Sequence, residues 1–208
     1  MAERLRLREP FTDAAQQAAA DRMGMFVFLG TEVMLFGGIL AVALVDRIEH
    51  PDAVIAASSR LDLWLGAINT VVLLTSSLAM AIATVAARQG RRKATLAALL
   101  ATAALGLAFL GLKGLEYAQD TAEGLIPVLA PPAVPTDPAQ ALFLNLYLTA
   151  TGLHAVHLTI GIGLVLWLAG RIARRRPAQA MTAELTGLYW HFVDIVWVFL
   201  YPVLYLVR

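Results

Sequence analysis

The residues of this chain that could do chemistry are a few titratable side chains set inside long apolar stretches. His191 and Asp194 stand three residues apart in the last stretch, and His154 and His157 have the same spacing in an earlier one. Glu32 stands among apolar neighbours near the N-terminus. In hydrocarbon each such group is costly unless it is paired, neutralised or near water, so these groups are candidates either for function or for packing.

Imidazoles in a membrane bundle are possible haem or copper ligands, and His191 with His154 or His157 would complete a bis-histidine haem site. We favour the alternative, in which each imidazole hydrogen-bonds to a carboxylate such as Asp194 or to a backbone carbonyl and fixes helix packing. A carboxylate-bridged metal pair needs Glu-x-x-His motifs on two helices, and the apolar stretches contain none. The chain also has no cysteine. We therefore expect no catalytic residue, no resident cofactor and no metal site.

Glu32 and Glu116 are two acids in these stretches, and only the interpretation of Glu32 is left open. Glu32 is either a buried acid that hydrogen-bonds to another helix or a group that takes part in proton handling or lipid contact, and spacing does not decide between them. Lys113 and Glu116 stand three residues apart near the end of a stretch. We expect them to form a local ion pair that snorkels to the outer surface.

The composition indicates which elements position these groups. Of 208 residues, 59% are hydrophobic and 15% are charged. A helix needs about 20 apolar residues to cross a bilayer core. We predict an all-α polytopic membrane protein in which a polar cytoplasmic tail, 1–22, precedes one five-helix membrane domain, 23–208, with spans at about 23–45, 63–87, 94–117, 141–170 and 187–207. A net charge of +1 gives no reason to expect a nucleic-acid partner.

The distribution of basic residues predicts the orientation of these spans. The tail, the second-to-third loop and the fourth-to-fifth loop each hold four Lys or Arg, whereas the other side holds only Arg47, Arg60 and Arg208. The positive-inside rule therefore places the N-terminus in the cytoplasm and the C-terminus outside. The second and third spans are joined by about six residues and should be antiparallel neighbours.

Five segments resemble the signature segments of subunit III of the haem–copper oxidases, one on each predicted helix and in the family's order. They are Thr31-Glu-Val-Met-Leu-Phe36, Asn69-Thr-Val-Val-Leu-Leu-Thr-Ser-Ser77, Glu116-Tyr117, Thr151-Gly-Leu-His-Ala-Val-His157 and Tyr189-Trp-His-Phe-Val-Asp-Ile-Val-Trp197. The resemblance extends over about residues 22–208 and implies a five-helix bacterial form of this family.

The resemblance implies a non-catalytic subunit of a proton-translocating terminal oxidase of the cytochrome c oxidase type in aerobic respiratory electron transport. The haems and copper would belong to subunits I and II of the same complex. The subunit would lie in the bacterial inner membrane, pack on subunit I, bind phospholipid in a cleft, and support proton uptake into subunit I and the integrity of that subunit.

The resemblance also assigns positions to individual residues. Glu32 matches the intramembrane carboxylate near the lipid cleft. His157, His191 and Asp194 match recurrent polar positions. Glu184 matches an acid shortly before the last signature segment, and we group it with the intramembrane packing residues.

Two departures from the family pattern affect these expectations. Seven-helix members have two further N-terminal helices beside the cleft, so we expect the cleft here to be more open or closed by a neighbouring subunit. Lys113 occupies a position where a neutral residue such as Gln is expected. Three alternative functions are subunit III of a quinol oxidase, the accessory protein of a nitric oxide reductase, and a small proton-coupled transporter that uses Glu32 and Asp194.

Overall fold

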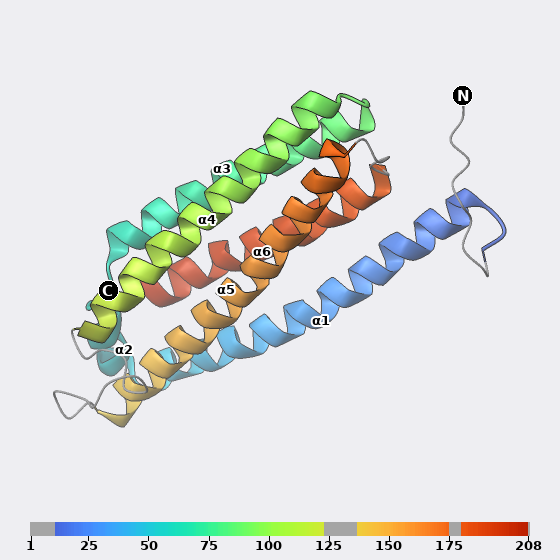
Figure 1. The fold of residues 1–208 in the computed structure, drawn as a ribbon. Helices are drawn as coiled ribbons and strands as arrows, with labels where there is room; N and C mark the ends of the chain where they lie inside the picture. The colour runs from blue at the N-terminus through green and yellow to red at the C-terminus, as the bar shows by residue number, and fades with distance from the viewer. Residues whose placement is uncertain (1–10, 123–136, 175–179, 208) are drawn as a thin grey trace.

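The computed structural model describes residues 11–122, 137–174 and 180–207 (Figure 1). The helices in these residues are α1 (Ala14–Glu49), α2 (Pro51–Ser58), α3 (Leu63–Arg88), α4 (Arg92–Ala122), α5 (Pro138–Ala173) and α6 (Ala180–Tyr205). All but α2 are long and apolar enough to cross a membrane. The predicted all-α fold with five spanning helices is confirmed.

Most helices extend beyond the predicted spans, and at α1 a capping group rather than hydropathy decides where the helix begins. The Asp13 side chain accepts a hydrogen bond of 2.7 Å from the Gln16 backbone N–H, so α1 begins at Ala14 and residues 14–22 of the predicted tail are helical. Residues 1–10 of that tail lie outside the described residues. Asp62 caps α3 in the same way, through the backbone N–H groups of Trp64 and Leu65.

The helix α2 is a short element that hydropathy alone did not predict. It begins at Pro51, and proline is favoured in a first helical turn because its missing N–H would be unpaired there anyway. The Ser58 hydroxyl at its end donates a 2.8 Å hydrogen bond to the Leu204 carbonyl of α6. This contact joins the α1-to-α3 connection to the C-terminal end of α6.

The predicted antiparallel pairing of the second and third spans is confirmed by α3 and α4, which lie side by side along their length (Figure 1). The turn between them contains Gly90, whose φ of 67° is in the left-handed region that glycine adopts without strain. Such a tight turn leaves the two helices little freedom to separate.

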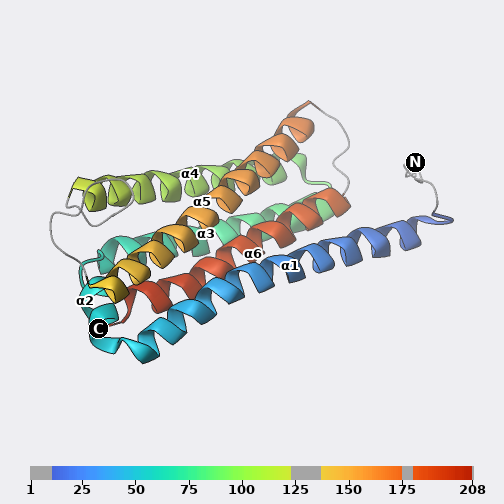
Figure 2. The ribbon, with the colours of Figure 1, turned by 90° about the horizontal axis from the view of Figure 1, so that it is seen from below.

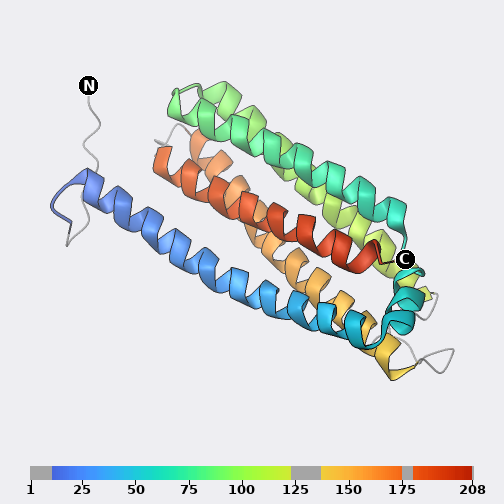
Figure 3. The ribbon, with the colours of Figure 1, turned by 180° about the vertical axis from the view of Figure 1, so that it is seen from behind.

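The bundle has one layer of α4 and α5 and a second layer of α3 and α6, with α1 beside α5 and α6 (Figures 1 and 3). Figure 2 shows that α1 and α5 lie close together near α2 and diverge toward the start of α1. The layers come close where Gly106 of α4 faces α6, because a Cβ at Gly106 would lie 2.8 Å from the Trp190 ring. The divergence of α1 from α5 leaves space between α1, α5 and α6.

The start of α1, the α3–α4 turn and the start of α6 lie at one end of the bundle (Figures 1 and 3). These are the ends that the basic residues were predicted to mark as cytoplasmic. α2 and the end of α6 lie at the other end. The basic clusters among the described residues therefore lie at the same end of the bundle. The orientation of the bundle across a membrane stays a prediction.

Candidate functional site

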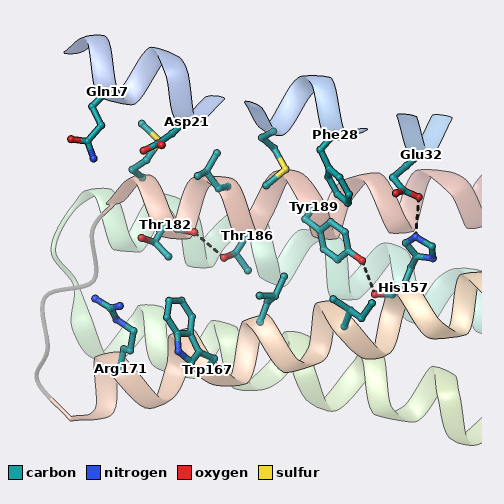
Figure 4. Close-up of a pocket in the computed structure, with 15 residues that line it drawn as sticks. Gln17, Asp21, Phe28, Glu32, His157, Trp167, Arg171, Thr182, Thr186 and Tyr189 are labelled. Atoms are coloured by element: carbon teal, nitrogen blue, oxygen red, sulfur yellow. Dashed lines mark hydrogen bonds and ion pairs between the residues drawn. The ribbon is translucent and has the colours of Figure 1, made fainter. Parts of the chain in front are cut away.

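A cleft of about 710 Å³ lies between α1, α5 and α6 (Figure 4). One end is polar, with Asp21 from α1 and Arg171 from α5. The other end carries Glu32 and His157. The wall between the two ends is mainly apolar and includes Met25, Phe28, Leu164 and Leu185. The cleft thus has a polar mouth, an apolar middle and a titratable pair at its deep end.

The Glu32–His157 pair joins α1 to α5 at half depth. Glu32 lies at the midpoint of α1, and its Oε2 is 3.0 Å from His157 Nε2. The other ring nitrogen, Nδ1, is 2.8 Å from the Leu153 carbonyl. Because a carbonyl only accepts, Nδ1 carries a proton, and the contact at Nε2 needs one further proton on either the ring or the carboxyl group. The pair therefore shares one proton and has no net charge.

Aromatic side chains fix the position of this pair. The Tyr189 hydroxyl of α6 donates a 3.1 Å hydrogen bond to the His157 carbonyl. The Tyr189 ring stacks on Phe28 of α1, and Phe36 lies edge-on to the His157 ring with centroids 5.3 Å apart. Three helices thus hold the His157 ring toward Glu32.

His154 does not take part in this pair, although it stands only three residues from His157. Its ring is fully buried between Phe109 and Trp197, at centroid distances of 5.6 and 5.2 Å. Within the described part of the chain neither ring nitrogen has a hydrogen-bond partner, so the expected bond to a carboxylate or carbonyl is wrong here. The two positions are only about 60° apart round α5, but His154 lies against rings of α4 and α6 whereas His157 lines the cleft.

His191 and Asp194 share a serine that the sequence reasoning did not include among the site residues. Ser77 Oγ of α3 is 2.7 Å from His191 Nδ1, and the Asp194 carboxylate interacts with both Ser77 and His191. Among the described residues, no hydrogen bond joins His191 directly to Asp194, and Asp194 Oδ1 is buried without a partner. The Thr75-Ser76-Ser77 run in the middle of an apolar span was the available signal for this serine.

We expect Asp194→Leu to lower the free energy of unfolding by about 1 to 3 kcal/mol, because Ser77 would lose its buried acceptor and His191 its neighbouring carboxylate. Denaturation of the purified chain in mild detergent measures this change, and recovery of the assembled complex measures its consequence. Glu49→Leu replaces an exposed acid and serves as the control. Unchanged stability together with normal assembly would contradict the prediction.

Lys113 and Glu116 form an ion pair, but the expected snorkelling to the surface is wrong. Lys113 Nζ is 3.0 Å from Glu116 Oε1, and the two residues are only 3% and 1% exposed. Nζ also donates to the hydroxyls of Tyr147 and Tyr205, and both of these hydroxyls donate to Glu116 Oε1. The two tyrosines supply inside the bundle the hydrogen bonds that water would supply at the surface.

The rings around Lys113 add a second favourable interaction. The centroids of Tyr117, Tyr147, Trp197 and Tyr205 lie 4.8 to 5.4 Å from Nζ, within the range of a cation–π contact. These rings come from α4, α5 and α6. The Lys113 cluster therefore connects three helices.

Glu184 lies near the start of α6 and contacts two other helices, and its role as an intramembrane packing residue stays a prediction. Its carboxylate is 2.9 Å from Arg88 Nη2 of α3 and 3.8 Å from Arg22 Nε of α1. This position follows from α6 beginning at Ala180, seven residues before the predicted span, so Glu184 lies in the second turn. It connects α1, α3 and α6 beside the mouth of the cleft.

The three histidines considered above as possible haem ligands have different neighbours in the structure. His157 faces Glu32 on α1, His191 faces Ser77 on α3, and His154 is enclosed by rings. In the described ranges, no three His, Asp or Glu side chains are close enough to hold a metal ion. The three imidazoles thus have separate neighbours rather than a shared one.

Comparison with known proteins adds an independent line of evidence. Residues 10–207 match the family model described as cytochrome c oxidase subunit III. The chain is 31% identical over 189 residues to cytochrome c oxidase subunit 3 of Thermostichus vulcanus, covering 88% of this chain and 86% of the relative. It is 30% identical over 185 residues to cytochrome bo(3) ubiquinol oxidase subunit 3 of Pseudomonas aeruginosa, covering 88% and 83%. It is 27% identical over 189 residues to a probable quinol oxidase subunit 3 of Staphylococcus haemolyticus, covering 90% and 89%. With five spanning helices that carry the signature segments in order, the chain belongs to the cytochrome c oxidase subunit III family.

Proposed function

We propose that this protein is the non-catalytic subunit III of a haem–copper terminal oxidase in a bacterial inner membrane. It packs on subunit I in a complex that also contains subunit II, and the haems and copper belong to those two chains. The observation that carries this proposal is the family match over residues 10–207. The geometry supports it, since most of the intramembrane titratable groups contact one another or neighbouring helices rather than converge on one reaction centre.

The cleft is suited to a phospholipid. From Gln17 to Glu32 it follows α1 for about 22 Å, at ~1.5 Å per residue, which is close to one leaflet with its headgroups. Arg171 and Gln17 at the polar mouth are suitable partners for a phosphate group. Phe28, Leu164 and Leu185 offer an apolar wall to the acyl chains. The lipid would thus extend from the mouth toward the Glu32–His157 pair.

The Glu32–His157 pair supports the proposed contribution to proton uptake. It holds one shared proton at half depth and lies on the wall of the cleft. An acid and a base that exchange a proton in place can do so without creating net charge in a low-dielectric region. The pair would therefore assist proton delivery to subunit I without any redox chemistry in this chain.

Purification in mild detergent tests the proposed function most directly. We expect the chain to co-purify with a haem- and copper-bearing partner, and to show no haem absorbance when it is isolated. Recovery without any haem-bearing partner would contradict the proposal. Substrate flux in vesicles that hold this chain alone would favour the transporter alternative.

A quinol oxidase is the second candidate complex, because two of the relatives above are subunits of quinol oxidases. Oxygen consumption by the purified complex with reduced cytochrome c or with a quinol as the electron donor separates the two types. Loss of nitric oxide consumption, rather than oxygen consumption, on deletion of the chain would favour the nitric oxide reductase alternative.

We expect Glu32→Gln to leave the haem spectrum of the complex unchanged and to reduce turnover, lipid occupancy or endurance during turnover. The Gln amide retains a hydrogen bond to His157 Nε2 but cannot release its proton, so packing persists while proton exchange is lost. Absorption spectra, repeated turnover and native mass spectrometry measure the three properties. Glu49→Gln, an exposed acid on the same helix, is the control. A lost haem signal in a correctly assembled complex would contradict this prediction.

A further inference from the structure

His191 is only partly buried on α6, and among the described residues only one of its ring nitrogens has a hydrogen-bond partner. Tyr189 lines the cleft, and His191 lies two residues further on, about 200° round the same helix. It is flanked by exposed apolar side chains of α3 and α6, namely Leu74, Leu78, Ile195 and Val198. We call these four residues, with Ser77 and His191, the His191 face; α3 and α6 run side by side there (Figure 3).

The His191 face lies in the part of the bundle that water reaches least. His191 is the twelfth residue of the 26-residue helix α6, about 2 Å from its midpoint at ~1.5 Å per residue. Ser77 lies equally near the midpoint of α3. A polar atom at this depth must find its hydrogen-bond partner in protein.

The hydrogen bonds of the chain satisfy only one side of the His191 ring. Nδ1 is paired with Ser77, whereas no described residue bonds to Nε2, and Nε2 is not enclosed like the unpaired nitrogens of His154. Exposed hydroxyls of the bundle differ from it, because Thr75 of α3 and Thr159 of α5 donate to carbonyls of their own helices. His191 Nε2 is therefore an outward polar atom that this chain leaves for another molecule.

We propose that the His191 face is the docking surface for a transmembrane helix of a partner subunit, which places a polar side chain against His191 Nε2. Acyl chains offer no hydrogen bond at this depth. A spanning helix satisfies its own backbone and brings a Ser, Thr, Asn, Gln or Tyr side chain there, while its apolar residues cover Leu78 and Ile195. The inference rests on the proposed packing against another oxidase subunit and specifies which surface makes that contact.

Photo-crosslinking in intact membranes tests the location of the surface. A benzophenone amino acid in place of Leu78 or Ile195 is expected to form adducts with another membrane protein chain. The matched controls are Leu107 of α4 and Val156 of α5, which are similarly exposed apolar residues on other faces and should give lipid adducts. Lipid adducts alone at positions 78 and 195, or adducts with a second copy of this chain there, would overturn the inference.

Two substitutions test the contributions of His191 Nε2 and His191 Nδ1 separately. The amide of His191→Asn reaches the position of Nδ1 and keeps the Ser77 bond, whereas the amide of His191→Gln reaches the position of Nε2. We expect His191→Asn to reduce retention of the chain in the purified complex about tenfold, which corresponds to loss of one good hydrogen bond. His191→Gln should retain it. Equal retention of both variants, or loss of His191→Gln alone, would overturn the inference.

The two proposals fail in different ways. If the wild-type chain co-purifies without a haem-bearing partner, yet positions 78 and 195 still crosslink to another membrane protein, the oxidase function fails and the docking surface stands. If the chain co-purifies with a haem-bearing subunit but crosslinks to it only through Leu107 or Val156, the docking surface is wrong and the oxidase function stands.

Discussion

Replacing Lys113 by Met is expected to lower the free energy of unfolding by about 3 to 5 kcal/mol, since it leaves a buried carboxylate without its cation. Glu116 is 1% exposed, and Lys113 is its cationic partner at 3.0 Å. Tyr147 and Tyr205 donate to the carboxylate but cannot balance its charge. The loss is large because the bundle offers this group no route to water.

A double variant tests whether the loss comes from the stranded charge. Lys113→Met combined with Glu116→Gln removes both charges, so we expect it to recover a substantial part of the stability lost in the single variant. Denaturation in detergent of the wild type, the two single variants and the double variant gives the four stabilities of this double-mutant cycle. Lys93→Met, which replaces an exposed lysine in the first turn of α4, is the matched control. Single and double variants of equal stability would contradict the buried-charge explanation.

Trp197→Ala is expected to cost about 3 to 5 kcal/mol, the range for truncating a large buried aromatic side chain. Trp197 is fully buried, and its ring contacts Phe109 and His154 at centroid distances of 4.8 and 5.2 Å. Its indole N–H donates a 3.1 Å hydrogen bond to Thr70 of α3. Truncation would open a cavity where α3, α4, α5 and α6 meet.

The chain contains a matched control for this experiment. Trp64 is 76% exposed on α3, so Trp64→Ala removes the same side chain without creating an internal cavity. Trp197→Phe retains a ring but loses the hydrogen bond to Thr70, and we expect a smaller loss, near 1 kcal/mol plus the cost of the volume removed. If the two alanine variants unfolded at the same denaturant concentration, Trp197 would not be the packing centre that its contacts indicate.

The proposed docking surface and the cleft involve different combinations of helices. The cleft between α1, α5 and α6 is proposed for phospholipid, and the His191 face of α3 and α6 is proposed for protein. Glu184 connects the two regions at one end of the bundle, because it contacts Arg22 of α1 and Arg88 of α3. A variant such as Glu184→Gln is therefore unsuitable as a control for either side.

The sequence by itself determined the number of spanning helices, the pairing of α3 with α4 and the family. The number of spans follows from the thickness of the hydrocarbon core, which sets the length of an apolar helix. The pairing follows because a short loop places the two helices it joins side by side. The family follows because its signature segments are local in sequence. Helix ends were less well determined, because Asp13 extends α1 through a capping bond that hydropathy does not register, although the start of α3 after Asp62 agrees with the predicted span.

Only the tertiary structure decided which polar groups meet. Depth along a helix can be counted from the sequence at ~1.5 Å per residue, and this count puts Glu32 and His157 both near the middle of their spans. Rotation about the helix axis and the identity of the facing helix cannot be counted, because side chains on several helices set them together. For this reason His157 rather than His154 faces Glu32, Ser77 lies between His191 and Asp194, and Lys113 is buried among tyrosines rather than extended to the surface.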